Sequence, residues 1–195
     1  MHVRVVTPPA PIVTWDEAKA HLRLSSNAEQ ALVESYIAAA TAWLDGPAGW
    51  LGRCIGVQEL ELTDCAFGND RLPFPPIVEL VSVEYTDGAG VDQIMPDTDY
   101  RLLANGSIWA QQWPSVGQSP DAVRVRYSAG YPDRMVVPEG GGDPVAVSTV
   151  PEPIKQAVLL LIGQWFVTRA SVAVGSINEM PFAVEALLAP YRVWR

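Results

Sequence analysis

The feature that most constrains the fold is an apolar helix near the C-terminus. It is predicted to run from Pro153 to about Arg169, and apolar side chains occur on nearly every face of its segment from Ile154 to Phe166. Such a helix must be covered on all sides, by its own domain or by neighbouring copies. Only about 14 residues are continuously apolar-rich, whereas a bilayer span needs roughly 20. The segment is therefore interpreted as a packing helix, which favours assembly over catalysis.

The composition is that of a folded, acidic protein. Of 195 residues, 49% are apolar and 18% are charged, which is enough apolar material for one core with a substantial insertion. The formal net charge is −9. Phosphate neutralisation requires clustered Lys and Arg, so this charge argues against a nucleic-acid grip.

The cysteines and histidines do not form a recognisable site. Cys54 and Cys65 are the only cysteines, and neither His2 nor His21 lies at zinc-ligand spacing from them. Two reduced thiols are favoured over a disulfide. The N-terminal segment lacks the apolar stretch of a secretory signal, so we expect a cytoplasmic chain.

The first 44 residues are expected to form an arm and two helices. Residues 1–13 contain three prolines within four positions and are predicted to be an extended arm. Thr14 is a candidate helix N-cap, and Glu17 three residues later completes a capping box for a short helix at 15–22. Apolar residues recurring at i+3 and i+4 predict a second helix over about 27–44.

The middle of the chain changes to strand periodicity. Residues 57–63 alternate strictly between polar and apolar, as a half-buried strand does. Four further strands are expected in the same antiparallel sheet, at 78–85, 100–103, 107–109 and 122–127. The Gly-rich stretch 139–144 is predicted to be a flexible loop before the long helix.

This order of elements predicts an α+β fold. We expect a helical core built from both chain ends, with a small antiparallel β-sheet domain inserted between its halves. The predicted divisions are 1–56 for the N-terminal arm and helices, 57–135 for the inserted β region, and 136–195 for the loop, long helix and docking tail.

Several segments follow one another in an order that is informative as a series. The helix opening from Thr14 to Leu24 contains Glu17-Ala18-Lys19 and then His21-Leu22-Arg23. The other segments are the helix end 38–44, the link and strand 72–87, the strand 125–131, Val150-Pro151 with the apolar helix, and the tail 187–192. In this order they resemble the head–tail connector (adaptor) proteins of long-tailed bacteriophages and phage-derived gene transfer agents. The resemblance is to the longer members that carry a β insertion, and it covers nearly the whole chain.

The resemblance implies a structural virion protein with no catalytic residues, cofactor or metal. It implies a homo-oligomeric ring, expected to be a dodecamer, beneath the portal protein. The ring would extend the DNA channel and join the capsid to the stopper or tail-completion protein. Duplex DNA would pass without sequence-specific binding, and no membrane is involved. The implied location is the cytoplasm of the producing bacterium during assembly, then the neck of the particle.

The candidate contact residues lie in the C-terminal quarter. Tyr, Trp and Arg are common anchors of interfaces, and an apolar tail is normally tied down onto something. The residues expected to contact the portal or neighbouring subunits are Trp165, Arg169, Leu187, Leu188, Tyr191, Arg192, Trp194 and Arg195.

Other motifs are better explained without chemistry. The carboxylate pairs Glu59/Glu61 and Asp97/Asp99 are typical of solvated strand faces, and Gly140-Gly141-Gly142 lacks the Gly-Lys-Ser/Thr of a phosphate-binding loop. Two alternatives stay open. One is a stopper or tail-terminus component of the same particle; the other is a small enzyme or ligand-binding module that uses the β insertion.

Overall fold

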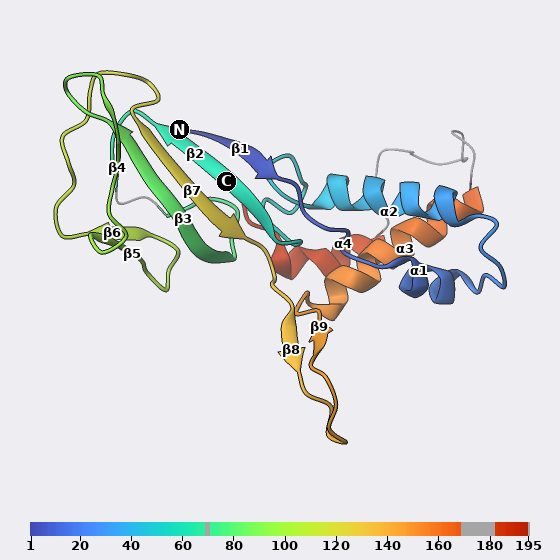
Figure 1. The fold of residues 1–195 in the computed structure, drawn as a ribbon. Coiled ribbons are helices and arrows are strands. Elements are labelled where there is room, and N and C mark those ends of the chain that lie inside the picture. Colours follow the sequence, from blue (N-terminus) through green and yellow to red (C-terminus); the bar gives the residue numbers. More distant parts are fainter. Residues whose placement is uncertain (69–70, 169–181, 195) are drawn as a thin grey trace. The chain divides into compact units, whose positions relative to one another are not determined.

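The computed structural model describes residues 1–68, 71–168 and 182–194 (Figure 1). These residues form an α+β fold with four α-helices and antiparallel sheets. The chain divides into two compact units. The sheet unit consists of Met1–Ala10 and Arg53–Asp133, and the helical unit consists of Pro11–Gly52 and Arg134–Arg195.

The sheet unit is built on a five-stranded antiparallel sheet with strand order β1-β2-β7-β3-β4. The strands are β1 (His2–Thr7), β2 (Gln58–Asp64), β7 (Val123–Ala129), β3 (Ile77–Thr86) and β4 (Asp92–Ile94). Two shorter strands, β5 (Tyr100–Leu102) and β6 (Ile108–Ala110), pair as a separate ribbon. All five predicted strands therefore exist. The prediction that they share one sheet was wrong for β5 and β6, which form their own ribbon.

The first residues of the chain belong to the main sheet. β1 pairs with β2 so that Val3 lies opposite Leu62 and Val5 opposite Leu60. This corrects the expectation that the N-terminal arm belongs to a helical core. Pro8 and Pro9 follow the strand instead of interrupting it, so they terminate β1 without removing hydrogen bonds from its ladder.

Alternation along the strands separates a buried face of the sheet from a polar one. In β7, Val123, Val125, Tyr127 and Ala129 are buried while the residues between them are half-buried. Leu60 and Val83 pack in the same core from the neighbouring strands. The Tyr127 hydroxyl donates to the carbonyl oxygen of Pro73 at 3.0 Å, which satisfies the one polar atom of that side chain.

The helical unit is organised around its longest helix. Its elements are α1 (Trp15–Leu22), α2 (Gln30–Leu44), α3 (Glu152–Thr168), α4 (Phe182–Leu188) and the 3₁₀ turn η1 (Ala189–Tyr191). α3 contacts α1, α2 and α4, and its buried residues include Ile154, Val158, Leu161 and Ile162. The prediction of an apolar packing helix is confirmed, although Arg169 lies outside the described residues.

Helix α1 begins with the predicted capping box. The Glu17 backbone N–H donates to Thr14 Oγ1 at 3.2 Å, and the Thr14 backbone N–H donates to Glu17 Oε2 at 2.7 Å. Lys155 of α3 approaches the other oxygen of Glu17 at 3.3 Å. Burial raises the pKa of the Glu17 carboxyl, but the hydrogen bonds from Thr14 and the pairing with Lys155 outweigh it, so the pKa lies below its ordinary value. The start of α1 is thus bound to the central helix.

A hairpin that the sequence did not suggest also belongs to the helical unit. β8 (Arg134–Val136) pairs antiparallel with β9 (Val145–Val147), and the Gly-rich stretch forms part of the loop that joins them. Gly141 and Gly142 have φ angles of 78° and 128°, which L-residues with side chains rarely adopt. No helix in the described part of the chain is long and apolar enough to cross a membrane.

Candidate partner interface

The end of the chain is tied to the loop that follows α2. After η1, the Val193 backbone N–H donates to the Leu51 carbonyl oxygen at 2.9 Å. Gly52, the next residue of that loop, has a φ angle of 64°. A Cβ at this position would lie 2.6 Å from the Val193 carbonyl oxygen, so only glycine allows the tail to lie this close. The tail is therefore a fixed part of the helical unit as far as Val193.

An arginine between two tryptophans marks the outer end of this tail. The Arg192 guanidinium carbon lies 4.0 Å from the ring centroid of Trp50 and 3.9 Å from that of Trp194. We call these residues the Trp–Arg–Trp stack. Each cation–π contact contributes about 0.5–1 kcal/mol at an exposed site. Trp194 nevertheless remains 76% exposed, so the stack presents a large aromatic surface to solvent.

Trp165 belongs to a second aromatic group, between α2 and α3. Its ring centroid lies 6.1 Å from that of Tyr36, edge to face, and 6.3 Å from that of Trp43. Trp165 is half-buried, whereas Trp43 is 38% exposed. Within one protomer, Trp165 thus acts in helix packing, with the edge of the group reaching the surface.

The predicted contact residues do not gather into one cluster. Arg192 and Trp194 come together with Trp50, which sequence reasoning missed because it lies in a loop with no periodic pattern. Leu188 is fully buried in the helical unit, while Leu187 and Tyr191 are half-buried. Arg169 and Arg195 lie outside the described residues.

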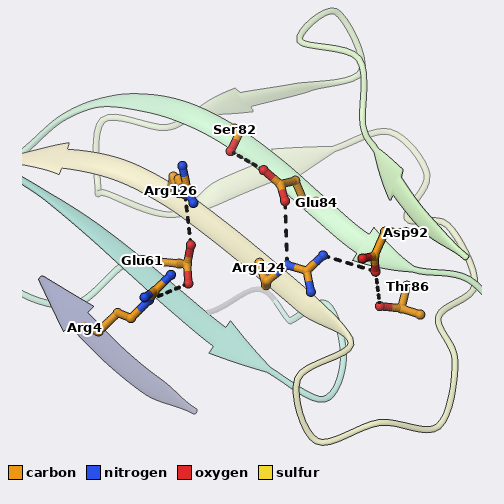
Figure 2. A network of polar contacts seen from close by, with 8 residues as sticks. All are labelled: Arg4, Glu61, Ser82, Glu84, Thr86, Asp92, Arg124 and Arg126. Atoms are coloured by element: carbon orange, nitrogen blue, oxygen red, sulfur yellow. Dashed lines mark hydrogen bonds and ion pairs between the residues drawn. The ribbon is translucent and has the colours of Figure 1, made fainter. Parts of the chain in front are cut away.

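The polar face of the main sheet carries a network of ion pairs (Figure 2). Glu61 of β2 accepts a hydrogen bond from Arg4 Nε at 2.8 Å and another from Arg126 Nε at 2.9 Å, from the strands on either side. The Glu61 side chain is only 6% exposed. The hydrogen bond from Arg4, followed by that from Arg126, holds the pKa of this carboxyl below its ordinary value despite burial.

A second part of the network lies toward β4. Arg124 approaches Glu84 at 3.6 Å and Asp92 at 3.1 Å, and Asp92 also accepts from the Thr86 hydroxyl at 2.8 Å. The Thr86 hydroxyl, together with Arg124, lowers the pKa of Asp92. All three arginines drawn in Figure 2 are thus matched by carboxylates, so this face is not a basic patch.

The charged side chains of this network join neighbouring strands of the sheet to one another. Glu61, a member of one candidate carboxylate pair, is engaged by two arginines. Within residues 1–68, 71–168 and 182–194, no cluster of three His, Cys, Asp or Glu side chains is placed to hold a metal ion. Asp99, from the other pair, borders an open hollow of about 410 Å³ together with Thr98, Trp109, Gln111 and Gln112.

The whole chain is similar to chains of gene transfer agent (GTA) particles. A chain in the neck of an empty GTA particle, computed with C6 symmetry, matches with a TM-score of 0.72 and 26% identity. A chain in the virion of a native GTA particle matches with the same values. In each case the match covers 100% of this chain and 97% of the other.

A chain in the neck of a native GTA particle, computed with C12 symmetry, has a TM-score of 0.62 at 23% identity, which is evidence for the fold alone. The sequence matches no protein-family model and no curated protein. The fold is therefore one that occurs in the necks of GTA particles, with both the sheet unit and the helical unit included in the match.

Proposed function

We propose that the chain is a structural component of the neck of a GTA or related phage particle, and that it acts there as the head–tail adaptor. The observation that supports this most strongly is the full-length likeness to a chain of a GTA neck at a TM-score of 0.72. In this role, a ring of copies lies beneath the portal protein and extends the DNA channel toward the stopper or tail-completion protein. The chain is made in the cytoplasm of the producing bacterium and ends in the particle neck.

Ring formation is supported by the symmetry of the similar assemblies. The necks that contain similar chains were computed with C6 and C12 symmetry. A ring forms when one surface of a subunit meets a different surface of the next and the rotation between subunits closes. A dodecamer is the proposed state of this chain.

The charge of the chain suits a channel through which duplex DNA passes. Its net charge is −9, and the arginines of the polar sheet face are engaged by Glu61, Glu84 and Asp92. Like charge disfavours adhesion of a phosphate backbone, and engaged arginines release few counterions on contact with it. DNA is therefore expected to pass through the channel without binding stably to the protein.

The surface proposed to face the portal is the C-terminal tail, with the Trp–Arg–Trp stack at its outer end. Trp and Arg dominate interface energetics when a partner desolvates them, and Trp194 is already exposed on a fixed support. Truncation after Ala186 would remove the whole proposed contact surface. It would also remove the buried Leu188 and the hydrogen bond from Val193 to Leu51, so a loss of binding could not be separated from a loss of folding. Truncation after Val193 leaves both in place.

The adaptor role is tested by co-sedimentation of the purified chain with DNA-filled, tailless heads that carry only the portal. Direct binding, saturating at a fixed number of copies per head, is the expected result. Binding that requires a further neck protein would instead support the alternative role of a stopper or tail-terminus component. If the chain binds heads neither alone nor with a further neck protein, but binds a small ligand at the hollow beside Asp99 and Trp109, the result would support a ligand-binding module.

A further inference from the structure

The β8–β9 hairpin exposes apolar side chains that no other element covers. Met135 is 62% exposed, Val137 60%, Val145 54% and Val147 43%. Of the helices and strands that the structure describes, β8 and β9 contact only each other. The hairpin is therefore supported by its own short ladder and by its connections to the chain.

Apolar side chains lie on both faces of this hairpin. Residues opposite each other in an antiparallel pair point to the same side. One face thus carries Met135 and Ala146, and the other carries Val136 with Val145, and Val147 opposite Arg134. A hairpin that lay flat on one body would need only one apolar face. Two apolar faces are expected of a hairpin that inserts between two protein surfaces.

Such an isolated hairpin is costly to maintain in water. A two-stranded hairpin is at best marginally stable alone, and its unpaired edges invite further strand pairing. Covering large apolar side chains removes apolar surface from water, and the gain in free energy grows with the area covered. A partner that encloses the hairpin would therefore both order it and gain binding energy.

We propose that the β8–β9 hairpin docks against a second copy of this chain, the neighbouring subunit of the ring. The inference rests on the proposed function, because a ring joins one surface of each subunit to a different surface of the next. The similar chains come from necks with C6 and C12 symmetry. The hairpin and the C-terminal tail are different segments, so each can be altered without changing the other.

The direct test places a photo-crosslinking residue at position 145 of the full-length chain. Unlabelled probe-bearing protein is mixed with ¹⁵N-labelled protein, bound to portal-bearing heads and irradiated, and mass spectrometry identifies the linked peptides. The same probe at Val91, which is 53% exposed in the sheet unit, is the matched control. We expect light–heavy links between two copies from position 145, at least tenfold above those from position 91. Links to the portal or another neck protein, or equal yields from both positions, would overturn the proposal.

Two variants measure what the contact contributes. Met135→Asp with Val145→Asp alters exposed side chains, so the unfolding temperature should stay unchanged while the copies bound per head fall at least tenfold. Ile94→Asp, at a residue 74% exposed in β4, should bind as wild type does. Full occupancy by the double variant would contradict the proposal.

Failure of the adaptor role gives a different result. If wild-type protein does not bind the heads, the crosslinking is repeated in concentrated solution. Light–heavy links from position 145 would then keep the hairpin contact while the adaptor role fails. If no light–heavy links form in concentrated solution, both the hairpin contact and the adaptor role are overturned.

Discussion

Glu61 connects three strands of the main sheet through a single carboxylate. Its two oxygens accept from Arg4 and Arg126, so its loss leaves two neighbouring guanidinium groups without the carboxylate that pairs them. Hydrogen bonds to charged groups contribute about 1.5–3 kcal/mol each. Glu61→Gln keeps the shape and removes the charge, and we expect it to lower the free energy of unfolding by about 2 kcal/mol at pH 7.

The effect of this substitution depends on pH in a defined direction. Because the folded-state pKa of Glu61 lies below its ordinary value of 4.5, its stabilisation is fully present above pH 4.5 and is lost as the pH falls through the folded-state pKa. Urea unfolding of wild type and Glu61→Gln at pH 7 and at several lower pH values should show the difference shrinking with acid. Glu139→Gln, in an exposed loop, is the control. A constant difference across this range would contradict the role of the carboxylate.

Gly52 decides whether the C-terminal tail can lie against the loop after α2. Gly52→Ala places a Cβ 2.6 Å from the Val193 carbonyl oxygen in a backbone with a φ angle of 64°. The left-handed conformation alone costs about 1–2 kcal/mol for a residue with a Cβ. We expect this loss in chemical denaturation, together with faster proteolysis of the tail. Gly88→Ala, where no atom lies within 4 Å of the added Cβ, should change neither.

At this scale, the sequence predicts local partners and misses distant ones. Thr14 and Glu17 are three residues apart and form the predicted capping box. The Lys155 that pairs with Glu17 is 138 residues away, and no local pattern indicates it. The exposed His21 of α1 lies against Gly163 of α3, where an added Cβ would be 3.3 Å from the His21 Nε2 atom, and no local pattern indicates this contact either.

Among the elements, α1 depends on its first turn because it spans only Trp15–Leu22. Thr14→Ala removes the side chain that accepts from the Glu17 N–H, and loss of such a cap costs about 1 kcal/mol. We expect that decrease in the free energy of unfolding. The Thr14→Ser variant, which keeps the hydroxyl, should retain most of the stability. Equal losses in both variants would show that the methyl group, and not the cap, is responsible.

The tail is the element on which the proposed portal contact depends. Trp194→Ala removes an exposed ring and one of the two faces that stack on Arg192. We expect unfolding of the free protein to change by less than about 1 kcal/mol, while the affinity for portal-bearing heads falls at least tenfold. Trp109→Ala, at a ring 43% exposed that stacks on Arg101 in the sheet unit, is the matched control. Equal losses from both substitutions would place the contact elsewhere.

Elements with a strong local pattern were predictable, and those defined by distant pairing were not. α2 has apolar residues at helical spacing, α3 is a continuous apolar-rich run, and β2 alternates, so all three were recognised. β1 is a strand because it pairs with β2, which is more than 50 residues away in the sequence. The prolines that follow β1 led to the prediction of an extended arm instead. β8 and β9 lie on either side of the Gly-rich stretch 139–144, which was predicted to be a loop, so this part of the chain was not expected to form strands.

On the scale of the whole molecule, the class of fold followed from the sequence more readily than the assignment of the chain ends. The α+β class is confirmed, but the five-stranded sheet begins with residues 2–7, and the first ten residues belong to the sheet unit. The likeness to GTA neck chains supports the family resemblance at the level of the particle region. An exposed surface such as the Trp–Arg–Trp stack, proposed here as a partner contact, produces no periodic pattern in the sequence.

The measurement that tests the central claim most directly is electron microscopy of DNA-filled, tailless heads mixed with the purified protein. The account predicts an added ring of density beneath the portal with cyclic symmetry, into which the sheet unit and the helical unit fit as separate bodies. Portals that stay bare at saturating protein concentration would contradict it.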